Sequence, residues 1–316
     1  MLGSNIVNEI SNKIIKRITK KDANVHGSES YDHYKDQYWN NLDLVQQYIN
    51  ENATGNRDTL WQVDILTRFK EHVPFKKVLV IGCGNGWVER QLYDLGVGLH
   101  FDAFDISEKY LESAKSLSGN RDINYFKADI NNLTNLGEST YDAIFNVGVL
   151  HHTFRLSLAV WKLSRALKPN GLMFNFDYVG PTRNQYSKEH LEILKNTNSE
   201  LPKRFQSPHP LRPSKRDFDF GDPSEAIHSD LVRDTVERFF DITYQRDING
   251  GIAYQILWNN IDEFKKNDID AVKNLKFLLE KDIEYTKSKA VPVLFWYAVG
   301  TPRAKDKIKY WELLPP

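Results

Sequence analysis

Short apolar runs alternate with amphipathic segments across the middle of the chain. Each run has the length of a buried strand, and a stretch with helical spacing of its apolar residues separates it from the next. The predicted strands are Val78–Ile81, Phe101–Asp105, Asn124–Lys127, Tyr141–Val147 and Gly171–Tyr178. Predicted helices begin near Gly86, Ser107 and Ser157. This alternation predicts an α/β fold in which helices cover both faces of a mostly parallel sheet.

The regions on either side of this core follow other patterns. Four isoleucines at every fourth position of Ile6–Ile18 predict an amphipathic helix. Two more helices are expected over Tyr31–Asn50 and near Asp58–Glu71, and a polar, proline-rich segment over Gly180–Pro223 contains one predicted helix at Lys188–Lys195. The remaining expected elements are a helix at Ser229–Arg238, a strand at Phe240–Asp247, two helices within Tyr254–Lys287 and a strand at Pro292–Val299.

The composition narrows the classes of function. The 316 residues include 42 basic and 42 acidic side chains, so the basic excess typical of nucleic-acid-binding proteins is missing. A single cysteine excludes an internal disulfide and a thiolate-built zinc site. No apolar run reaches the roughly 18 residues that span a bilayer, and no secretory signal is visible. We therefore expect a cytoplasmic protein with no nucleic-acid partner and no stable membrane association.

A glycine-rich turn joins the first core strand to the helix after it. Gly82, Gly84 and Gly86 form a Gly-x-Gly-x-Gly pattern, which lets a ligand approach the backbone beside a helix N-terminus. Cys83 lies inside this turn, and we expect it to be a small packing residue rather than a nucleophile. Position 87, where a dinucleotide fingerprint has its third glycine, is a tryptophan. The turn therefore predicts a nucleotide-like ligand of another kind.

Two acidic residues follow the next two strands. Asp105 ends the second strand, where a carboxylate can accept both hydroxyls of a ribose. Asp129 ends the third strand and can accept the exocyclic amine of adenine, with Ile130 beside the ring. Either acid alone is also compatible with an ordinary strand end, but the two together with the glycine turn favour a nucleoside site.

These motifs together resemble the class I S-adenosylmethionine-dependent methyltransferases. The resemblance covers about Phe75–Pro181; Tyr141–Phe145 is similar to the fourth strand of that class, and Leu167–Gly171 to the turn before its fifth. It implies a Rossmann-like sheet of seven strands with an antiparallel last strand, and S-adenosylmethionine as cofactor with S-adenosylhomocysteine as product. The residues implied to bind the cofactor are Gly82, Cys83, Gly84, Gly86, Asp105, Ile106, Asp129, Ile130 and Asn146. The alternative is a domain of this fold that has lost its ligand or binds another nucleotide.

The ends of strands four and five carry the candidate catalytic residues. His151 and His152 follow strand four in a Leu-His-His turn, and histidine has the right pKa for a base near neutrality. Asp177 ends strand five, where it is a second candidate base or a substrate anchor. Each of these residues is also compatible with a structural role. We expect no metal, because the metal-assisted catechol type needs a third oxygen ligand at the end of strand four, and this sequence has no carboxylate there.

Further residues are expected to cover the cofactor and to bind the acceptor. The resemblance implies an N-terminal helix that closes over the donor, with Tyr38 or Trp39 packing on the sulfonium; core packing is the other interpretation. The stretches after strand five and around residue 225 resemble a bacterial small-molecule subgroup, and they contain the predicted substrate-binding residues Tyr178, Arg183, Tyr186, Glu225 and His228. Several basic residues lie in the segment after strand five, and they indicate either a site for an anionic acceptor or a solvated loop. These residues are Arg183, Arg204, His209, Arg212, Lys215 and Arg216.

We divide the chain accordingly into a helical cover or dimerisation region (1–72), a cofactor-binding core (73–181), a lid segment (182–228) and the C-terminal part of the fold (229–316). The predicted activity is methyl transfer to a small polar metabolite or sugar derivative, at oxygen. N- or C-methylation and a non-catalytic cofactor-binding protein are the alternatives. The N-terminal helix suits a homodimer contact.

Overall fold

The computed structural model describes residues 38–133, 136–214, 222–258 and 260–304. The predicted helix at Ile6–Ile18, the start of the helix predicted over Tyr31–Asn50, and the basic residues Lys215 and Arg216 lie outside these ranges. No helix in the described part of the chain has both the length and the apolar character needed to cross a lipid bilayer.

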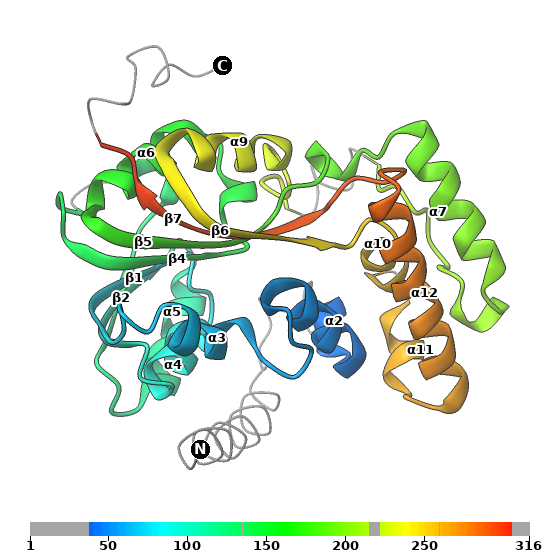
Figure 1. Cartoon of the computed structure of the whole chain (residues 1–316), viewed down its shortest axis with the longest axis horizontal. Coiled ribbons are helices and arrows are strands. Elements are labelled where there is room, and N and C mark those ends of the chain that lie inside the picture. Colours follow the sequence, from blue (N-terminus) through cyan, green and yellow to red (C-terminus); the bar gives the residue numbers. More distant parts are fainter. Residues whose placement is uncertain (1–37, 134–135, 215–221, 259, 305–316) are drawn as a thin grey trace.

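A seven-stranded sheet forms the centre of the molecule (Figure 1). Its order is β3-β2-β1-β4-β5-β7-β6, and β7 runs antiparallel to both of its neighbours. The strands are β1 Phe75–Ile81, β2 Gly98–Asp105, β3 Ile123–Lys127, β4 Tyr141–Val147, β5 Leu167–Tyr178, β6 Phe240–Asn249 and β7 Phe295–Pro302. The predicted fold class, with its antiparallel last strand, is confirmed. The order reverses between β1 and β4, which is the position where open α/β sheets bind ligands.

Helices cover both faces of the sheet. α6 and α9 lie on one face, and α2, α3, α4 and α5 on the other, while α7 and α10–α12 extend beyond one end of the strands (Figure 1). The α-helices are α2 Asp43–Thr54, α3 Trp61–Arg68, α4 Trp87–Asp94, α5 Glu108–Ser118, α6 Leu156–Ala166, α7 Lys188–Glu200, α9 Ser229–Phe239, α10 Ala253–Trp258, α11 Ile261–Lys265 and α12 Ile269–Lys287. The 3₁₀ turns are η2 Trp39–Asn41, η3 Ile130–Asn132, η4 Leu150–His152, η5 Thr182–Asn184 and η6 Lys203–Phe205.

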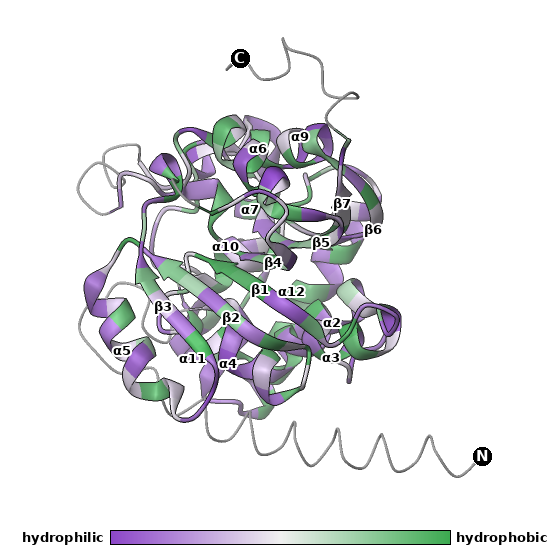
Figure 2. Ribbon diagram, turned by 90° about the vertical axis from the view of Figure 1, so that its left-hand side faces the viewer, coloured by the Kyte–Doolittle hydropathy of each residue, from purple (hydrophilic) through white to green (hydrophobic). Residues whose placement is uncertain are grey.

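Strand periodicity divides the core into two layers. Val78 and Val80 of β1 join the layer under α2–α4, whereas Leu79 and Ile81 join the layer under α6 and α9. This follows because successive side chains of a strand point to opposite faces. Both faces of the central strands β1 and β4 are buried, so these strands are apolar along most of their length (Figure 2).

Two predicted elements differ from the structure. Three helices rather than two lie within residues 253–287, because the chain turns at Asn260 and again at Asp268, which caps α12 by accepting the N–H of Ala271. The last strand begins at Phe295 rather than Pro292. Residues 291–294 are apolar, and Val291 and Leu294 are buried, but among them only the Leu294 backbone bonds to neighbours of the sheet, Val179 and Asn249.

Candidate functional site

The glycine turn lies between β1 and α4 at the switch point of the sheet. Gly82, Gly84 and Gly86 all have positive φ, from +52° to +80°, which favours glycine. A Cβ on Gly82 would lie 2.6 Å from a methyl carbon of Val149, and one on Gly86 would lie 2.4 Å from the Tyr125 hydroxyl. A Cβ on Gly84 would meet no atom within 4 Å. Side chains therefore pack closely against Gly82 and Gly86, whereas the space beside Gly84 is open.

Asp105 stands at the edge of this turn. Its Oδ2 accepts the N–H of Gly84 at 2.9 Å, and its Oδ1 accepts the N–H of Ser107 at 2.8 Å. Burial raises the pKa of its carboxyl, against these backbone hydrogen bonds. Ile106, next in the chain, is 63% exposed. An acid beside an open backbone turn, followed by an exposed apolar side chain, fits the ribose and adenine of a nucleoside.

Asp129 and Ile130 lie at the next strand end, at the start of η3. Asp129 caps this turn: its oxygens accept the backbone N–H of Asn131 at 2.8 Å and the side-chain amides of Asn131 and Asn132. A local structural role for Asp129 is thus evident, and contact with adenine stays a prediction. Cys83 is buried, and burial raises the pKa of its thiol, so that its sulfur packs as an uncharged atom.

The two predicted histidines and Asp177 come together at the ends of β4 and β5. Nδ1 of His151 donates to Oδ1 of Asp177 at 2.5 Å. Oδ2 of Asp177 accepts the N–H of Leu150 at 2.9 Å and the side-chain amide of Asn146 at 2.6 Å. His151 is 8% exposed and Asp177 is 1% exposed. The result is a buried carboxylate–imidazole pair that fixes the orientation of the ring.

Opposing effects set the pKa of His151. Burial lowers it, but the carboxylates of Asp177, Glu225 and Asp222 raise it by more, and the pKa lies above the ordinary value. The adjacent ring of His152 has its centroid 4.1 Å away. Burial and the neighbouring His151 hold the pKa of His152 below its ordinary value.

Residues 222–228, at the C-terminal end of the lid segment, bring further polar side chains to His151 and His152. Ser224 accepts from Nδ1 of His152 at 3.0 Å and donates to Asp222 at 2.6 Å. Oε2 of Glu225 lies 3.6 Å from Nε2 of His152 and 3.9 Å from Nε2 of His151. Of these three polar residues only Glu225 was predicted. Asp222 and Ser224 were missed, although an Asp-Pro-Ser sequence is typical of the Asx turn that they form.

Three residues predicted to bind or cover the cofactor have other contacts in the structure, and their contact with the cofactor stays a prediction. Asn146 is fully buried, and its amide donates to Asn175 and Asp177, so it helps to position the catalytic candidate. Trp39 packs against Phe295 with centroids 5.4 Å apart, which is a core contact. Tyr38 is 47% exposed.

The predicted substrate-binding tyrosines are interior residues. The rings of Tyr178 and His151 meet edge to face, with their centroids 6.0 Å apart. Tyr178 also forms a hydrogen bond with Tyr186, whose hydroxyl donates to Gln255 at 3.0 Å. Burial raises the pKa of both hydroxyls. His228 precedes the first turn of α9. Tyr178 therefore forms a wall of the site, whereas Tyr186 lies behind it.

Three arginines of the predicted basic set have different partners in the structure. Arg183 donates to the backbone carbonyls of Glu225 at 3.0 Å and Pro223 at 2.5 Å. Arg204 pairs with Glu263 at 2.8 Å and Asp268 at 2.6 Å, at α11 and the start of α12. Arg212 lines a separate surface hollow beside α7. Within the described residues, these three arginines thus do not share one site, and an anionic acceptor stays a prediction.

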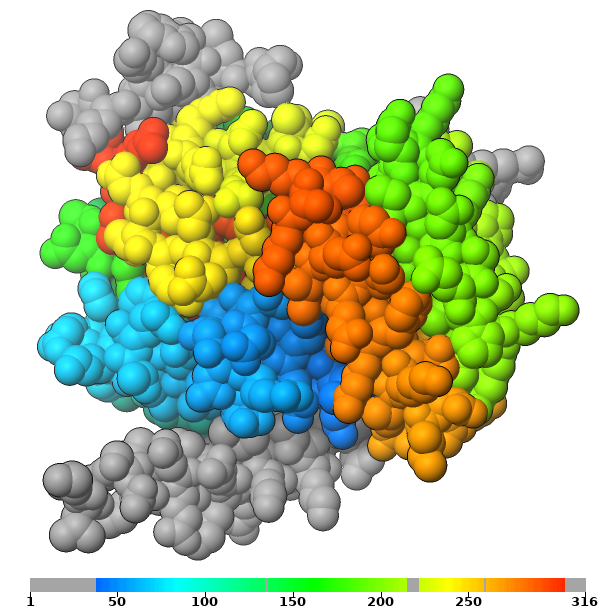
Figure 3. Space-filling view, turned by 45° about the vertical axis from the view of Figure 1, so that its right-hand side comes forward, coloured from blue at the N-terminus to red at the C-terminus, as the bar shows by residue number. Residues whose placement is uncertain are grey.

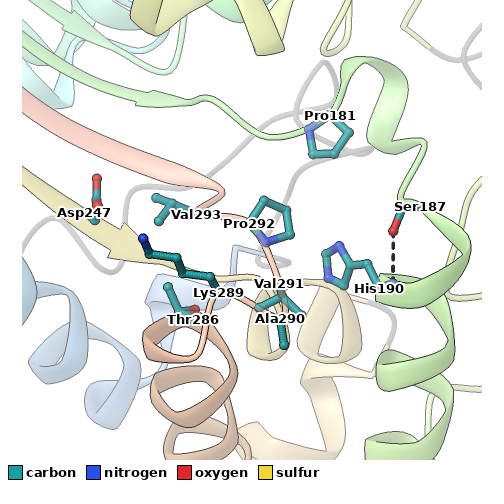
Figure 4. Close-up of a pocket in the computed structure, with 10 residues that line it drawn as sticks. All are labelled: Pro181, Ser187, His190, Asp247, Thr286, Lys289, Ala290, Val291, Pro292 and Val293. Carbon is teal, nitrogen blue, oxygen red and sulfur yellow. Dashed lines mark hydrogen bonds between the residues drawn. The ribbon is translucent and has the colours of Figure 1, made fainter.

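A cavity of about 530 Å³ lies elsewhere, between the N-terminus of α7 and the segment that leads into β7 (Figure 4). His190 of α7 and Ser187, which caps that helix, line it on one side, and Thr286 of α12 and Lys289, just after α12, line it on another. Neither the glycine turn nor His151 contributes to its wall. It is therefore distinct from the cluster at the ends of β4 and β5.

One buried acid beside the glycine turn escaped prediction. Glu89 in the first turn of α4 is fully buried, and burial raises its pKa to about 7. A Cβ on Gly86 would lie 2.8 Å from its Oε1. No pattern in the sequence marks this position, because an acid in the first turn of a helix is common for electrostatic reasons alone.

Comparison with known proteins identifies the class. Residues 79–175, which contain the glycine turn, Asp105, Asp129 and the Leu-His-His turn, match the family model of a methyltransferase domain. The predicted class is confirmed: the centre of this chain is a class I methyltransferase domain, and S-adenosylmethionine is the cofactor of that class.

Particular relatives cover only parts of the chain. The malonyl-(acyl-carrier protein) O-methyltransferase of Halalkalibacterium halodurans is 33% identical over 109 residues, which are 34% of this chain and 40% of the relative. The ubiquinone biosynthesis O-methyltransferase of Bartonella tribocorum is 32% identical over 100 residues, 31% of this chain and 39% of the relative. The chain thus spans less than half the length of these two proteins.

Among solved structures, an S-adenosylmethionine-dependent methyltransferase from Mesorhizobium loti aligns with 76% of this chain and 97% of its own length. The TM-score is 0.45 and the identity 14%.

Proposed function

We propose that this protein is an S-adenosylmethionine-dependent methyltransferase that methylates a small polar molecule at oxygen. The observation that carries the proposal is the place of the Asp177–His151 pair. Val149, two residues before His151, packs against Gly82 of the glycine turn. The buried imidazole therefore stands beside the open turn where the nucleoside would bind.

Each part of the site has a chemical role in this proposal. When bound, S-adenosylmethionine supplies an activated methyl group. The open backbone at Gly84 and the carboxylate of Asp105 hold the ribose, and Ile106 flanks the adenine. His151, with Nδ1 held by Asp177, presents Nε2 to the acceptor and takes the proton that a hydroxyl loses as it is methylated. Such proton removal contributes about 10²–10⁴-fold to a rate.

Oxygen is the favoured acceptor atom because the pair is built to move a proton. An amine acceptor in its neutral form would need no such base. The two O-methyltransferase relatives are in keeping with this choice. A location in the cytoplasm and a small-molecule acceptor belong to the same proposal.

Calorimetry with S-adenosylhomocysteine tests the cofactor half of the proposal. We expect the wild-type protein to bind this product, and Asp105→Ala to weaken binding by about 100-fold, because hydrogen bonds to a charged group contribute about 1.5–3 kcal/mol each. Glu112→Ala, which removes an exposed carboxyl on the following helix, is the matched control and should bind normally. A folded wild-type protein that binds neither product nor donor would refute the proposal.

A further inference from the structure

The cavity of about 530 Å³ beside the N-terminus of α7 has the size of a small-molecule site, since such sites have volumes of about 300–1,000 Å³. Val291 and Val293 are among its apolar lining residues, and polar side chains reach it from α7 and from the end of α12 (Figure 4). Mostly apolar walls with a few polar groups are typical of ligand sites. The polar groups therefore indicate what the cavity can bind.

His190 is a lining residue with one ring nitrogen to spare. Its side chain is 2% exposed, and the ring projects from α7 toward Pro292 (Figure 4). Nε2 lies 2.6 Å from the carbonyl oxygen of Gly251, which can only accept, so Nε2 carries the proton. Burial lowers the pKa of this imidazole, which keeps Nδ1 unprotonated near neutrality. Nδ1 is buried and accepts no hydrogen bond from the described residues.

Thr286 of α12 brings a second buried polar atom to the same lining. Its hydroxyl oxygen also has no hydrogen-bond partner among the described residues. A buried polar atom without a partner is costly, and folded proteins contain few of them. Two such atoms, from two separate helices, belong to residues that line one cavity. An occupant with a donor for Nδ1 and an acceptor for the Thr286 hydroxyl would satisfy both, and a hydroxyl group serves either role.

The charge of the lining favours a single negative charge on the occupant. Lys289, just after α12, is exposed at the cavity. Asp247, the acidic lining residue, pairs with Arg233 at 3.1 Å, which offsets its charge. The N-terminus of α7 adds the positive end of a helix dipole. One lysine balances a carboxylate better than a phosphate, whose charge at pH 7 approaches −2.

We propose that this cavity is a second ligand site, which binds a small carboxylic acid with a hydroxyl group on an apolar body. The carboxylate lies at Lys289, and the hydroxyl donates to Nδ1 of His190. The Thr286 hydroxyl donates to an oxygen of the ligand, and the apolar body packs on the valines of the lining. This inference goes beyond the proposed function, because its ligand is not the methyl acceptor.

Two tyrosines separate this cavity from the proposed methyl-transfer site. The His190 ring packs against Tyr186, with centroids 4.6 Å apart. Tyr186 is hydrogen-bonded to Tyr178, whose ring meets His151. The two sites are thus neighbours with a wall between them, and both can be occupied at once.

The test titrates the full-length protein with 6-hydroxyhexanoate, hexanoate and 1,6-hexanediol. These flexible probes share a chain length and differ in the two groups that the proposal requires. NMR of the histidine ring resonances measures affinity and place: the signals of His190 should shift, and those of exposed His72 should not. We expect 6-hydroxyhexanoate to bind at least about threefold more tightly than either of the others, both with and without S-adenosylhomocysteine.

Two variants test the assigned contacts. Thr286→Val keeps the shape of the side chain and should weaken 6-hydroxyhexanoate binding by about threefold or more. Its melting temperature should not fall, because the lost hydroxyl has no partner among the described residues, whereas a structural role would lower it. Lys289→Gln should weaken binding of 6-hydroxyhexanoate but not of 1,6-hexanediol. Lys287→Gln removes an exposed charge two residues earlier and is the matched control.

Binding of no probe at tens of millimolar would show that the cavity holds only water, and would overturn the inference. Equal affinities for hexanoate and 6-hydroxyhexanoate, or an unchanged affinity in Thr286→Val, would do the same. Displacement of the probe by S-adenosylhomocysteine would place it in the cofactor site instead. A wild-type protein that binds the probe at His190 but not S-adenosylhomocysteine would refute the proposed function and support this inference, so the two failures are distinguishable.

Discussion

The carboxylate of Asp177 decides the protonation of His151. Buried imidazoles ordinarily lose their proton more easily, because burial disfavours the charged form. Here Asp177 at 2.5 Å and Glu225 at 3.9 Å outweigh burial, and the pKa of His151 rises. The N–H of Leu150 and the amide of Asn146 hold Asp177 in place. A base of this kind is neutral, and therefore active, only above its raised pKa.

Replacing Asp177 by Asn should move that pKa downward. The amide removes the negative charge but keeps the size, so burial becomes the larger effect and the pKa of His151 should fall below 6.5, the value of an unperturbed imidazole. An NMR titration of the imidazole resonances measures this without an acceptor, and exposed His72 serves as internal reference. In the wild type, the rate of methyl transfer should rise with pH through the higher pKa. A His151 pKa unchanged in Asp177→Asn would contradict this account.

At the scale of elements, Arg183 fastens the segment 222–228 over the histidines. It has positive φ, +56°, and its guanidinium reaches the carbonyls of Pro223 and Glu225. The N–H of Ile227 donates to the carbonyl of His151 at 3.0 Å. Asp222, Ser224 and Glu225 are thereby held at the histidines from a part of the chain more than 70 residues away.

Arg183→Ala should loosen this segment without unfolding the protein. Two hydrogen bonds from a charged donor are lost, so we expect amide exchange in residues 222–228 to become at least about tenfold faster. Hydrogen–deuterium exchange with mass spectrometry measures this, while the affinity for S-adenosylhomocysteine should stay within about twofold. Arg212→Ala, an exposed arginine earlier in the lid segment, is the control. Unchanged exchange in Arg183→Ala would show that other contacts hold the segment.

At the scale of the whole molecule, Asp282 of α12 joins α2 to the C-terminal part of the fold. This fully buried carboxylate accepts the hydroxyl of Tyr48 at 2.6 Å and the N–H groups of Gly250, Ile252 and Ala253 at 2.6–3.2 Å. It thereby ties α2, the end of β6 and the start of α10 to α12. Figure 3 shows α12 on this face, between the α7 region and the α2 and β6 regions.

Asp282→Ala should destabilise the protein globally. It leaves three buried N–H groups and the Tyr48 hydroxyl without this partner, and we expect the free energy of unfolding to fall by about 3 kcal/mol or more. Urea denaturation followed by circular dichroism measures the change. Glu280→Ala, an exposed acid on the same helix, should differ little from the wild type. A loss below about 1 kcal/mol in Asp282→Ala would mean that this junction contributes little to stability.

Local patterns were sufficient for the architecture and for the class of protein. Strand-length apolar runs, the glycine turn and the acids at strand ends are adjacent in sequence, so their structural consequences follow from short-range rules. The same rules failed where a role depends on a distant partner. The amide of Asn146 is an example: it donates to Asp177, 31 residues further along the chain, and its predicted contact with the cofactor stays a prediction.

The sequence by itself determined the class of protein and the order of strands and helices in the core, because periodicity and turn chemistry are local properties of the chain. Only the tertiary structure decided how the charges are used. From the sequence, Arg183 and Arg204 belong to one basic set, compatible with an anion site or a solvated loop, but folding directs one to backbone carbonyls and the other to Glu263 and Asp268. Folding also brings Glu225 to His151 and His152 from more than 70 residues away. Electrostatic interactions depend on distance in space, and the path of the lid segment sets that distance.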